Sequence, residues 1–211
     1  MAHQIALRIL VLYCGMSLFG CGKGFGGNPP AVVVALRDKG NIVEYEAYHR
    51  SLYIRKVKDL TPLLTCDPTE IDGVCVTDRQ FSDLSFFSRL IHLEWVNIQR
   101  TSVTDLSHIS KFTNLRDLVL SDTRVTDISP LRSLSNLEAL SLIRTKIDDL
   151  TPLTGLAKLK RIGLAESRVG DLSPLTKLTN LEWLNLRIGT ATAKEVAMLR
   201  KALPRCEILA D

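Results

Sequence analysis

Seven sequence positions recur at intervals of 22 residues, and each of them is apolar in five consecutive copies. The five copies begin at Phe81, Val103, Val125, Ile147 and Val169. In the third copy the seven apolar positions are Val125, Ile128, Leu131, Leu134, Leu137, Leu140 and Leu142. A fixed period of this length indicates a solenoid, because one coil alone cannot bury its apolar face and must stack on its neighbours.

Each copy divides into a strand and a turn. Leu140 and Leu142 are separated by one residue, so both leucines point inward while Ser141 points outward. This alternation predicts one short parallel strand per copy, with neighbouring strands about 4.8 Å apart. In the other half of the copy, Ser129 before Pro130 favours the start of a short 3₁₀ or α turn, with the serine hydroxyl as its cap.

The leucine spacing predicts the fold class, which is an α/β solenoid formed by a right-handed coil of leucine-rich repeats. Parallel strands would line its concave side, short 3₁₀ or α turns its convex side, and helices would cap its ends. The period continues beyond the five copies. It predicts further strands in the same register at residues 74–76 and 206–208, and an irregular copy at residues 52–54.

Both ends carry capping signals. Thr192 and Glu195 have the spacing of a capping box and predict a C-terminal helix. Residues 32–39 are predicted as an N-terminal helix ended by Gly40, although three consecutive valines also suit a buried strand there. The predicted parts are a signal peptide at 1–20, a flexible tether at 21–30, an N-terminal cap with the irregular first repeat at 31–73, leucine-rich repeats at 74–191, and a C-terminal cap helix with the final strand at 192–211.

Two polar positions mark the corners of the coil. Asparagine precedes the strand leucine at Asn114, Asn136 and Asn180, where it tolerates the left-handed conformation that a sharp turn needs. After the strand, a hydroxyl residue recurs at Thr101, Thr123, Thr145 and Ser167. We expect each hydroxyl to bond the backbone of the neighbouring coil.

The stretches 125–142 and 147–164 resemble the internalin-like leucine-rich repeats of bacteria, whose units carry a strand, an Asx-type corner and a D-I-S-P-L-x-x-L convex segment. The resemblance covers roughly residues 50–211. The chain departs from the family at the corner, where threonine or serine replaces the usual asparagine. The resemblance implies protein recognition and does not identify a partner.

The first thirty residues predict export. Arg8 precedes an uncharged apolar run at residues 9–19, which is too short to span a bilayer because a spanning helix needs about 20 residues. The run ends in Leu-Phe-Gly-Cys, which resembles a lipobox with Cys21 as the lipid attachment site. The alternative is an ordinary secretory signal cleaved nearby. The glycine-rich residues 22–30 favour a tethered protein in the bacterial cell envelope, at the outer membrane if one is present.

The five cysteines fit an exported protein. Cys14 lies in the signal, and Cys206 occupies a core column as a small buried hydrophobe. Cys66 and Cys75 remain, and an oxidising compartment predicts a disulfide between them. A metal site at these two cysteines is the weaker alternative, since no histidine lies near either in the repeat register.

The sequence predicts neither an enzyme nor a bound cofactor or metal. His49, His92 and His108 are scattered, and no phosphate loop or zinc spacing occurs. Aspartate recurs just before each convex turn, at Asp83, Asp105, Asp127, Asp149 and Asp171. These carboxylates suit backbone N–H groups better than calcium, which needs six or more oxygens. A formal charge of +4 is too mild to indicate nucleic acid.

The outward-facing strand positions remain as candidate recognition residues. They form three columns: Trp95, Asp117, Ala139, Arg161, Trp183; then Asn97, Val119, Ser141, Gly163, Asn185; then Gln99, Ser121, Ile143, Ala165, Arg187. Tryptophan and arginine are enriched in interaction hot spots. The predicted partner-binding residues are Trp95, Asn97, Gln99, Asp117, Val119, Ser121, Arg161, Trp183, Asn185 and Arg187. Alternatively, the two tryptophans pack on the end caps.

The leading hypothesis is a monomeric, non-enzymatic recognition module that binds a protein or peptide on the concave sheet. Two other functions are open. One is a structural envelope scaffold without a selective ligand, and the other is a lipoprotein that binds glycan or peptidoglycan through tryptophans and amides.

Overall fold

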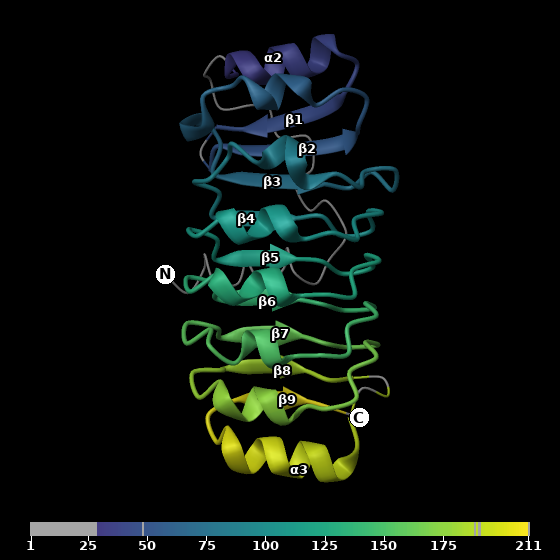
Figure 1. Cartoon of the computed structure of the whole chain (residues 1–211), viewed down its shortest axis with the longest axis vertical. Coiled ribbons are helices and arrows are strands. Elements are labelled where there is room, and N and C mark those ends of the chain that lie inside the picture. Colours follow the sequence, from purple (N-terminus) through teal and green to yellow (C-terminus); the bar gives the residue numbers. More distant parts are fainter. Residues whose placement is uncertain (1–28, 48, 188, 190, 211) are drawn as a thin grey trace.

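A computed structural model describes residues 29–47, 49–187, 189 and 191–210 of the chain. The expected signal peptide, Cys21 and most of the tether lie outside the described residues. The described chain is an elongated stack of coils with one helix at each end (Figure 1). These helices are α2 (Ala31–Asp38) and α3 (Ala193–Ala202), and no helix of the described residues is long and apolar enough to cross a membrane.

A sheet of nine strands, in the order β1 to β9, runs along the stack. The first pair is antiparallel and every later pair is parallel. The strands are β1 (Ile42–Glu46), β2 (Ser51–Lys56), β3 (Gly73–Val76), β4 (Trp95–Asn97), β5 (Asp117–Val119), β6 (Ala139–Ser141), β7 (Arg161–Gly163), β8 (Trp183–Asn185) and β9 (Glu207–Leu209). The predicted leucine-rich repeat solenoid is confirmed.

The apolar repeat positions form one continuous core. From Phe81 to Leu186 each of these side chains is buried, and the most exposed, Val169, shows 8% of its surface. The predicted turns are 3₁₀ helices on the convex side. They are η1 (Thr61–Leu64), η2 (Pro68–Glu70), η3 (Leu84–Phe87), η4 (Ser107–Lys111), η5 (Ser129–Ser133), η6 (Thr151–Leu153) and η7 (Ser173–Lys177).

The aspartate row, rather than the serine hydroxyl, caps these turns. Asp127 accepts the backbone N–H of Ser129 at 2.7 Å, and the Ser129 hydroxyl donates to the same carboxylate at 2.9 Å. The other four aspartates of the row accept the equivalent N–H at 2.7–2.8 Å. The predicted serine cap is therefore wrong, whereas the predicted use of the aspartates by backbone N–H groups is confirmed.

The polar corners act differently from the prediction. Asn136 and Asn180 each donate from Nδ2 to a carbonyl of the preceding coil at 2.8 Å, so they link coils. The left-handed residues other than glycine instead follow the strands and, among the described residues, are Arg50, Arg100, Asp122, Arg144 and Glu166. The hydroxyls of Thr101, Thr123 and Thr145 each donate to a carbonyl three residues earlier in their own coil, at 2.6–2.7 Å. The fourth corner hydroxyl, that of Ser167, is buried without a hydrogen-bond partner among the described residues. Both corner predictions are wrong in detail, because these short side chains reach the nearest free carbonyl.

The N-terminal prediction of a helix is confirmed, and the competing strand over residues 31–36 is wrong. β1 and its antiparallel pairing were not anticipated. At the C-terminus, β9 pairs Trp183 with Glu207, a step of 24 residues instead of 22. The longer helix α3 replaces a 3₁₀ turn and shifts the register by two. Cys206 therefore lies before the strand and is half-buried, so its predicted place in a core column is wrong.

Candidate functional site on the concave sheet

The three predicted columns lie side by side on the outer face of the sheet. Pairing of β4 through β8 aligns the first two columns. The third column follows the strand ends, where backbone hydrogen bonds such as that from the Arg100 N–H to the Ser121 carbonyl continue the alignment. The columns contain both large and small side chains. The orientation of the large side chains depends on the small residues beside them, as Trp95 and Arg161 show.

Trp95 lies across β3 instead of projecting from the sheet. A Cβ built on Gly73, its partner in the parallel pair, would come within 1.9 Å of the Trp95 indole nitrogen. The same indole packs against Tyr53, with ring centroids 5.8 Å apart and planes tilted by 48°. Trp95 therefore belongs to an aromatic cluster at the N-terminal end of the sheet, where it packs on β3 and on Tyr53 of β2.

Arg161 similarly lies across β6. Its Nη2 is 3.6 Å from Oδ1 of Asp117, two strands away, and only Ala139 separates them in the column. A longer side chain at Ala139 would block this ion pair. Nε of Arg161 is buried and makes no hydrogen bond within the described part of the chain. The structure thus brings Asp117 and Arg161 together as predicted site residues.

Most of the other predicted residues are uncharged and several form local hydrogen bonds, whereas Arg187 is charged. Oγ atoms of Ser121 and Ser141 are 2.7 Å apart. Asn97 accepts the backbone N–H of Gln99 at 3.1 Å, and Asn185 accepts that of Arg187 at the same distance. The remaining residues of the columns lie as follows: Val119 and Ala165 are buried, Gly163 adjoins Ile143, Trp183 is half-buried and Arg187 is exposed.

Two rows of charged residues border the concave face. Before the strands the signs alternate along Glu94, Arg116, Glu138, Lys160 and Glu182, and after the strands along Arg100, Asp122, Arg144 and Glu166. We call these the leading row and the trailing row. Glu138 lies 3.7 Å from Arg116 and 3.4 Å from Lys160. These pairs link successive coils and neutralise most charge at the borders.

The trailing row is the tighter of the two. Arg144 makes two hydrogen bonds to Asp122, at 2.6 and 2.9 Å, and one to Glu166 at 3.2 Å. The Arg144 guanidinium, chiefly through these hydrogen bonds, lowers the pKa of the Asp122 carboxyl. The sequence already contained this alternation, but a search restricted to apolar columns does not reveal it.

The predicted disulfide between Cys66 and Cys75 is wrong, because both are free thiols. Cys75 lies on β3 in the outward column of Tyr53 and Asn97, and burial raises its pKa to about 12. Cys66 follows the convex turn η1, where its thiol donates to the Leu63 carbonyl at 3.3 Å. The strand and the turn hold the two sulfurs on different sides of the coil.

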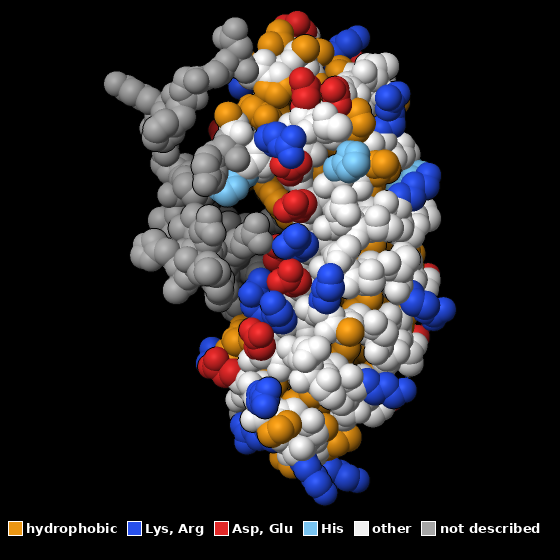
Figure 2. Space-filling model, turned by 90° about the vertical axis from the view of Figure 1, so that its left-hand side faces the viewer, with side chains coloured by type: hydrophobic (Ala, Val, Ile, Leu, Met, Phe, Trp, Pro, Cys, Tyr) orange, Lys and Arg blue, Asp and Glu red, His pale blue; other side chains and the backbone are white. Residues whose placement is uncertain are grey.

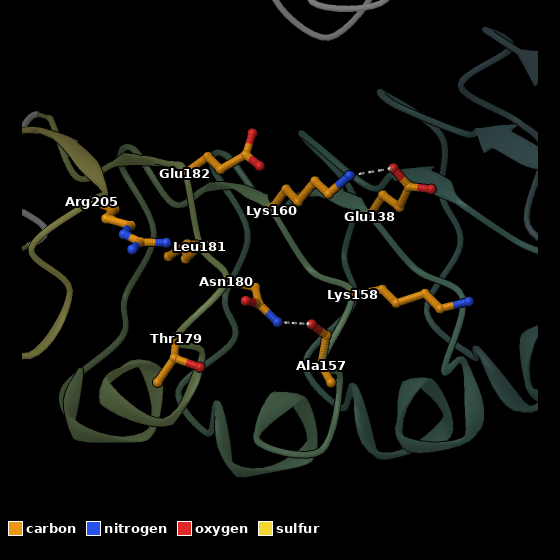
Figure 3. A pocket seen from close by; sticks show the side chains of 9 residues that line it. All are labelled: Glu138, Ala157, Lys158, Lys160, Thr179, Asn180, Leu181, Glu182 and Arg205. Atoms are coloured by element: carbon orange, nitrogen blue, oxygen red, sulfur yellow. Dashed lines mark hydrogen bonds and ion pairs between the residues drawn. The ribbon is translucent and has the colours of Figure 1, made fainter.

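A lateral hollow of about 300 Å³ lies beside the last coils, and sequence reasoning missed it. It is lined by Glu138, Ala157, Lys158, Lys160, Thr179, Asn180, Leu181, Glu182 and Arg205 (Figure 3). Arg205 reaches this site because the last coil departs from the 22-residue period. Among the described residues, no group of three or more histidine, cysteine or acidic side chains is placed to hold a metal ion.

Comparison with known proteins gives a consistent result. The family of Leucine Rich repeats (2 copies) matches residues 113–155. An internalin (inlF) from Listeria monocytogenes superposes with a TM-score of 0.65 and 26% identity, covering 77% of this chain. Internalin C2 (inlC2) from the same organism gives a TM-score of 0.63 and 27% identity over 72% of this chain.

The Leptospira interrogans LRR protein LIC12759 shares the fold, with a TM-score of 0.50 and 20% identity over 65% of this chain and 46% of its own. The chain spans 48% of the inlF structure and 66% of the inlC2 structure. No curated protein sequence matches the chain. The chain therefore contains leucine-rich repeats and is structurally similar to Listeria internalins.

Proposed function

We propose that this protein is a non-enzymatic recognition module that binds a protein or peptide partner on its concave sheet. The similarity to internalins supports a binding function of this general kind. The observation that carries the proposal is the surface formed by β4 to β8. The borders of this surface are neutralised by the charged rows. Between the borders, small residues lie on the middle strands β6 and β7, and aromatic and amide side chains lie on β4 and β8.

The Asp117–Arg161 pair supports a polar contact at the centre of this surface. A buried donor without a partner costs about 1–3 kcal/mol, and Nε of Arg161 is such a donor. A carbonyl group of a bound partner reaches this nitrogen only when Arg161 moves from its place across Ala139, and binding would then recover part of this cost. Trp95 contributes less, because its indole is already packed on Gly73 and Tyr53.

Site-specific photocrosslinking tests the binding face. A photoreactive amino acid replaces Ile143 on the concave face or, as the control, exposed Arg132 on the convex face. Envelope extract should yield a discrete crosslinked species from the Ile143 position only. The proposal fails if both positions, or only the convex one, give the same species. Crosslinking to purified cell-wall polymer would instead favour glycan binding, and no species from either position would favour a scaffold.

We further propose that the protein is exported and lipid-anchored through Cys21 in the bacterial cell envelope. The apolar run, the Leu-Phe-Gly-Cys ending and the glycine-rich tether support this proposal. Membrane fractionation of wild type and of Cys21→Ser tests it. The wild type should sediment with membranes and incorporate labelled palmitate, whereas the variant should do neither. Equal sedimentation without label in both proteins would contradict the anchor.

A further inference from the structure

Positive charge is concentrated in the C-terminal part of the chain. Residues 157–210 contain 10 lysines and arginines against 5 acidic residues, whereas residues 29–156 contain 15 against 17. The excess lies at the end of the stack that α3 closes. The lower end of the space-filling view shows basic side chains beside exposed apolar ones (Figure 2).

Helix α3 places part of this charge on its outward face. Val196 and Leu199 are buried against the last coil, so the opposite side of the helix faces solvent. Lys194, Met198 and Lys201 lie on that side at spacings of four and three residues, which align side chains on one helical face. Met198 shows 36% of its surface. We call these three residues together with Arg205 the cap stripe.

The lysines and arginine of the cap stripe are not neutralised by the fold. Within the coils, arginines such as Arg144 are held by carboxylates of the neighbouring coils. In the described part of the chain, no ion pair involves Lys194, Lys201 or Arg205. Glu195, the acidic residue of α3, is occupied by the capping box, in which it accepts from Thr192 at 2.7–2.8 Å.

Arg205 of the cap stripe also lines the lateral hollow. Figure 3 shows Arg205 reaching over Leu181 from one side of the hollow, while Asn180 turns towards the carbonyl of Ala157. Thr179 and Glu182 supply further hydrogen-bonding groups to its lining. A hollow with such groups can hold a side chain and part of a peptide backbone. A bilayer is too flat to enter it.

We propose that the cap stripe and the lateral hollow form a second interaction surface, which binds an acidic segment of a protein partner. Carboxylates of the segment pair with Lys194, Lys201 and Arg205, and an apolar side chain packs on Met198. Glu182 accepts a backbone N–H of the segment at the edge of the hollow. Complementary charge of this kind speeds association and makes the affinity depend on salt. This surface is separate from the concave sheet, so neither proposal depends on the other.

Charge reversal tests the second surface. The probe is a fluorescein-labelled polyglutamate peptide, and fluorescence anisotropy at about 0.1 M salt, where the Debye length is about 10 Å, measures its affinity. K194E with K201E should weaken binding about tenfold or more, because two attractive charges become repulsive. The control is K111E with K146E, two exposed lysines on other coils, which changes the net charge equally. It should stay within about twofold of wild type, since more distant exposed charges are largely screened.

Three results would overturn the proposal. One is an absence of peptide binding by the wild type, and another is equal loss in the two double variants, which would indicate only general attraction. The third is capture of phosphatidylglycerol vesicles without binding of the peptide, which would indicate a membrane surface. Arg205→Ala should weaken peptide binding, with Arg132→Ala as its control, and an unchanged affinity would remove the hollow from the site. Photocrosslinking at Ile143 should be unaffected by K194E with K201E.

Discussion

Small residues determine how the large side chains of the concave face lie. Gly73 leaves room for the Trp95 indole, and Ala139 leaves room for the arm of Arg161. Both large side chains lean towards the N-terminal end, across one strand or more. At the scale of single residues, the large side chains of the concave face are therefore packed against their neighbours on the sheet and do not project freely into solvent.

Gly73→Ala should destabilise the protein by about 1–3 kcal/mol, the usual cost of overpacking. The new methyl group would coincide with the indole, so Trp95 must leave its place beside Tyr53. Urea unfolding would measure the loss, and tryptophan fluorescence of the native state should shift to the red.

Gly155→Ala is the matched control, because nothing lies within 4 Å of a Cβ at that position. It should leave both the stability and the fluorescence nearly unchanged. Equal effects of the two substitutions would show that the contact between Trp95 and Gly73 is not what holds the indole.

The thiols provide a second prediction at the residue scale. Burial raises the pKa of Cys75 to about 12 and that of Cys206 to about 11, so both stay protonated at pH 8. Ellman's reagent should react slowly with the native protein and at once with Cys66, Cys75 and Cys206 after unfolding without reductant. If Cys66 and Cys75 react only after reduction, the disulfide exists after all.

At this scale the sequence predicted which residues lie on the concave face but not how they are arranged. The columns follow from alternation and period alone. The contact of Trp95 with Gly73 depends on side-chain direction, and the strand alternation leaves that direction open. The spacing of Cys66 and Cys75 likewise gave no information on which side of the coil each thiol faces.

Among the secondary-structure elements, capping groups stabilise both the last helix and the convex turns. α3 begins with a complete capping box, in which the Thr192 hydroxyl accepts the N–H of Glu195 at 3.3 Å. The turns begin with aspartates that accept the N–H two residues later. Both devices satisfy backbone donors that have no partner inside a helix.

Thr192→Ala should cost about 1 kcal/mol, as is typical for the loss of an N-cap hydroxyl. The loss should appear in urea unfolding and as faster amide exchange in the first turn of α3. Thr113→Ala, at an exposed position on a coil, is the control and should be nearly neutral. A similar loss in both variants would mean that the capping box contributes little.

Asp149 and Asp148 are adjacent, so they allow a matched test of the convex carboxylates. The N–H of Thr151, followed by its hydroxyl, lowers the pKa of Asp149. Because the folded-state pKa lies below the unfolded value of about 4, this stabilisation is complete above that value and is lost as the pH falls through the folded-state pKa.

Asp149→Asn should therefore flatten the fall of the melting temperature on the acid side of pH about 4, whereas Asp148→Asn should leave that fall unchanged. Calorimetry in a series of acidic buffers would compare them. If the melting temperature falls equally steeply with decreasing pH in the two variants, Asp149 does not contribute in this way.

The strongly periodic elements were predictable because each coil repeats the same local physics. Strands, 3₁₀ turns and the capping box of α3 were recognised from spacing. β1 and the shifted β9 were not, since both lie where the period ends and packing against α2 or α3 decides the register. The lateral hollow was missed for the same reason.

At the scale of the whole molecule, the two charged rows connect the coils. Each row alternates in sign from one coil to the next, so every charge inside a row has opposite charges on both neighbouring coils. Exposed pairs contribute little individually, typically 0–1 kcal/mol, yet a row of them opposes any slip between coils. A repeat protein depends on such contacts between neighbours.

Removing coils tests this directly. Deletion of residues 115–136 removes one coil and brings Glu94 beside Glu138 and Arg100 beside Arg144. Deletion of residues 115–158 removes two coils and restores opposite neighbours in both rows. The double deletion should therefore lose less than twice the free energy of unfolding lost by the single deletion, measured by urea unfolding at low salt.

High salt provides the control for this comparison. Salt screens the like charges, so the extra loss in the single deletion should disappear at high ionic strength. Both deletions remove Asp117, so the loss of its pair with Arg161 is common to them. If the single deletion still shows the extra loss of unfolding free energy in high salt, the cause is packing rather than charge.

The alternation also bears on how such a chain could lengthen. Its apolar core repeats with every coil, but its borders repeat only with every second coil. A duplication of one coil would place like charges beside each other in both the leading and the trailing row. A duplication of two coils would preserve the alternation. Lengthening by two coils at a time therefore keeps opposite charges adjacent. An insertion of an odd number of coils would need compensating charge substitutions where the inserted coils meet the old ones.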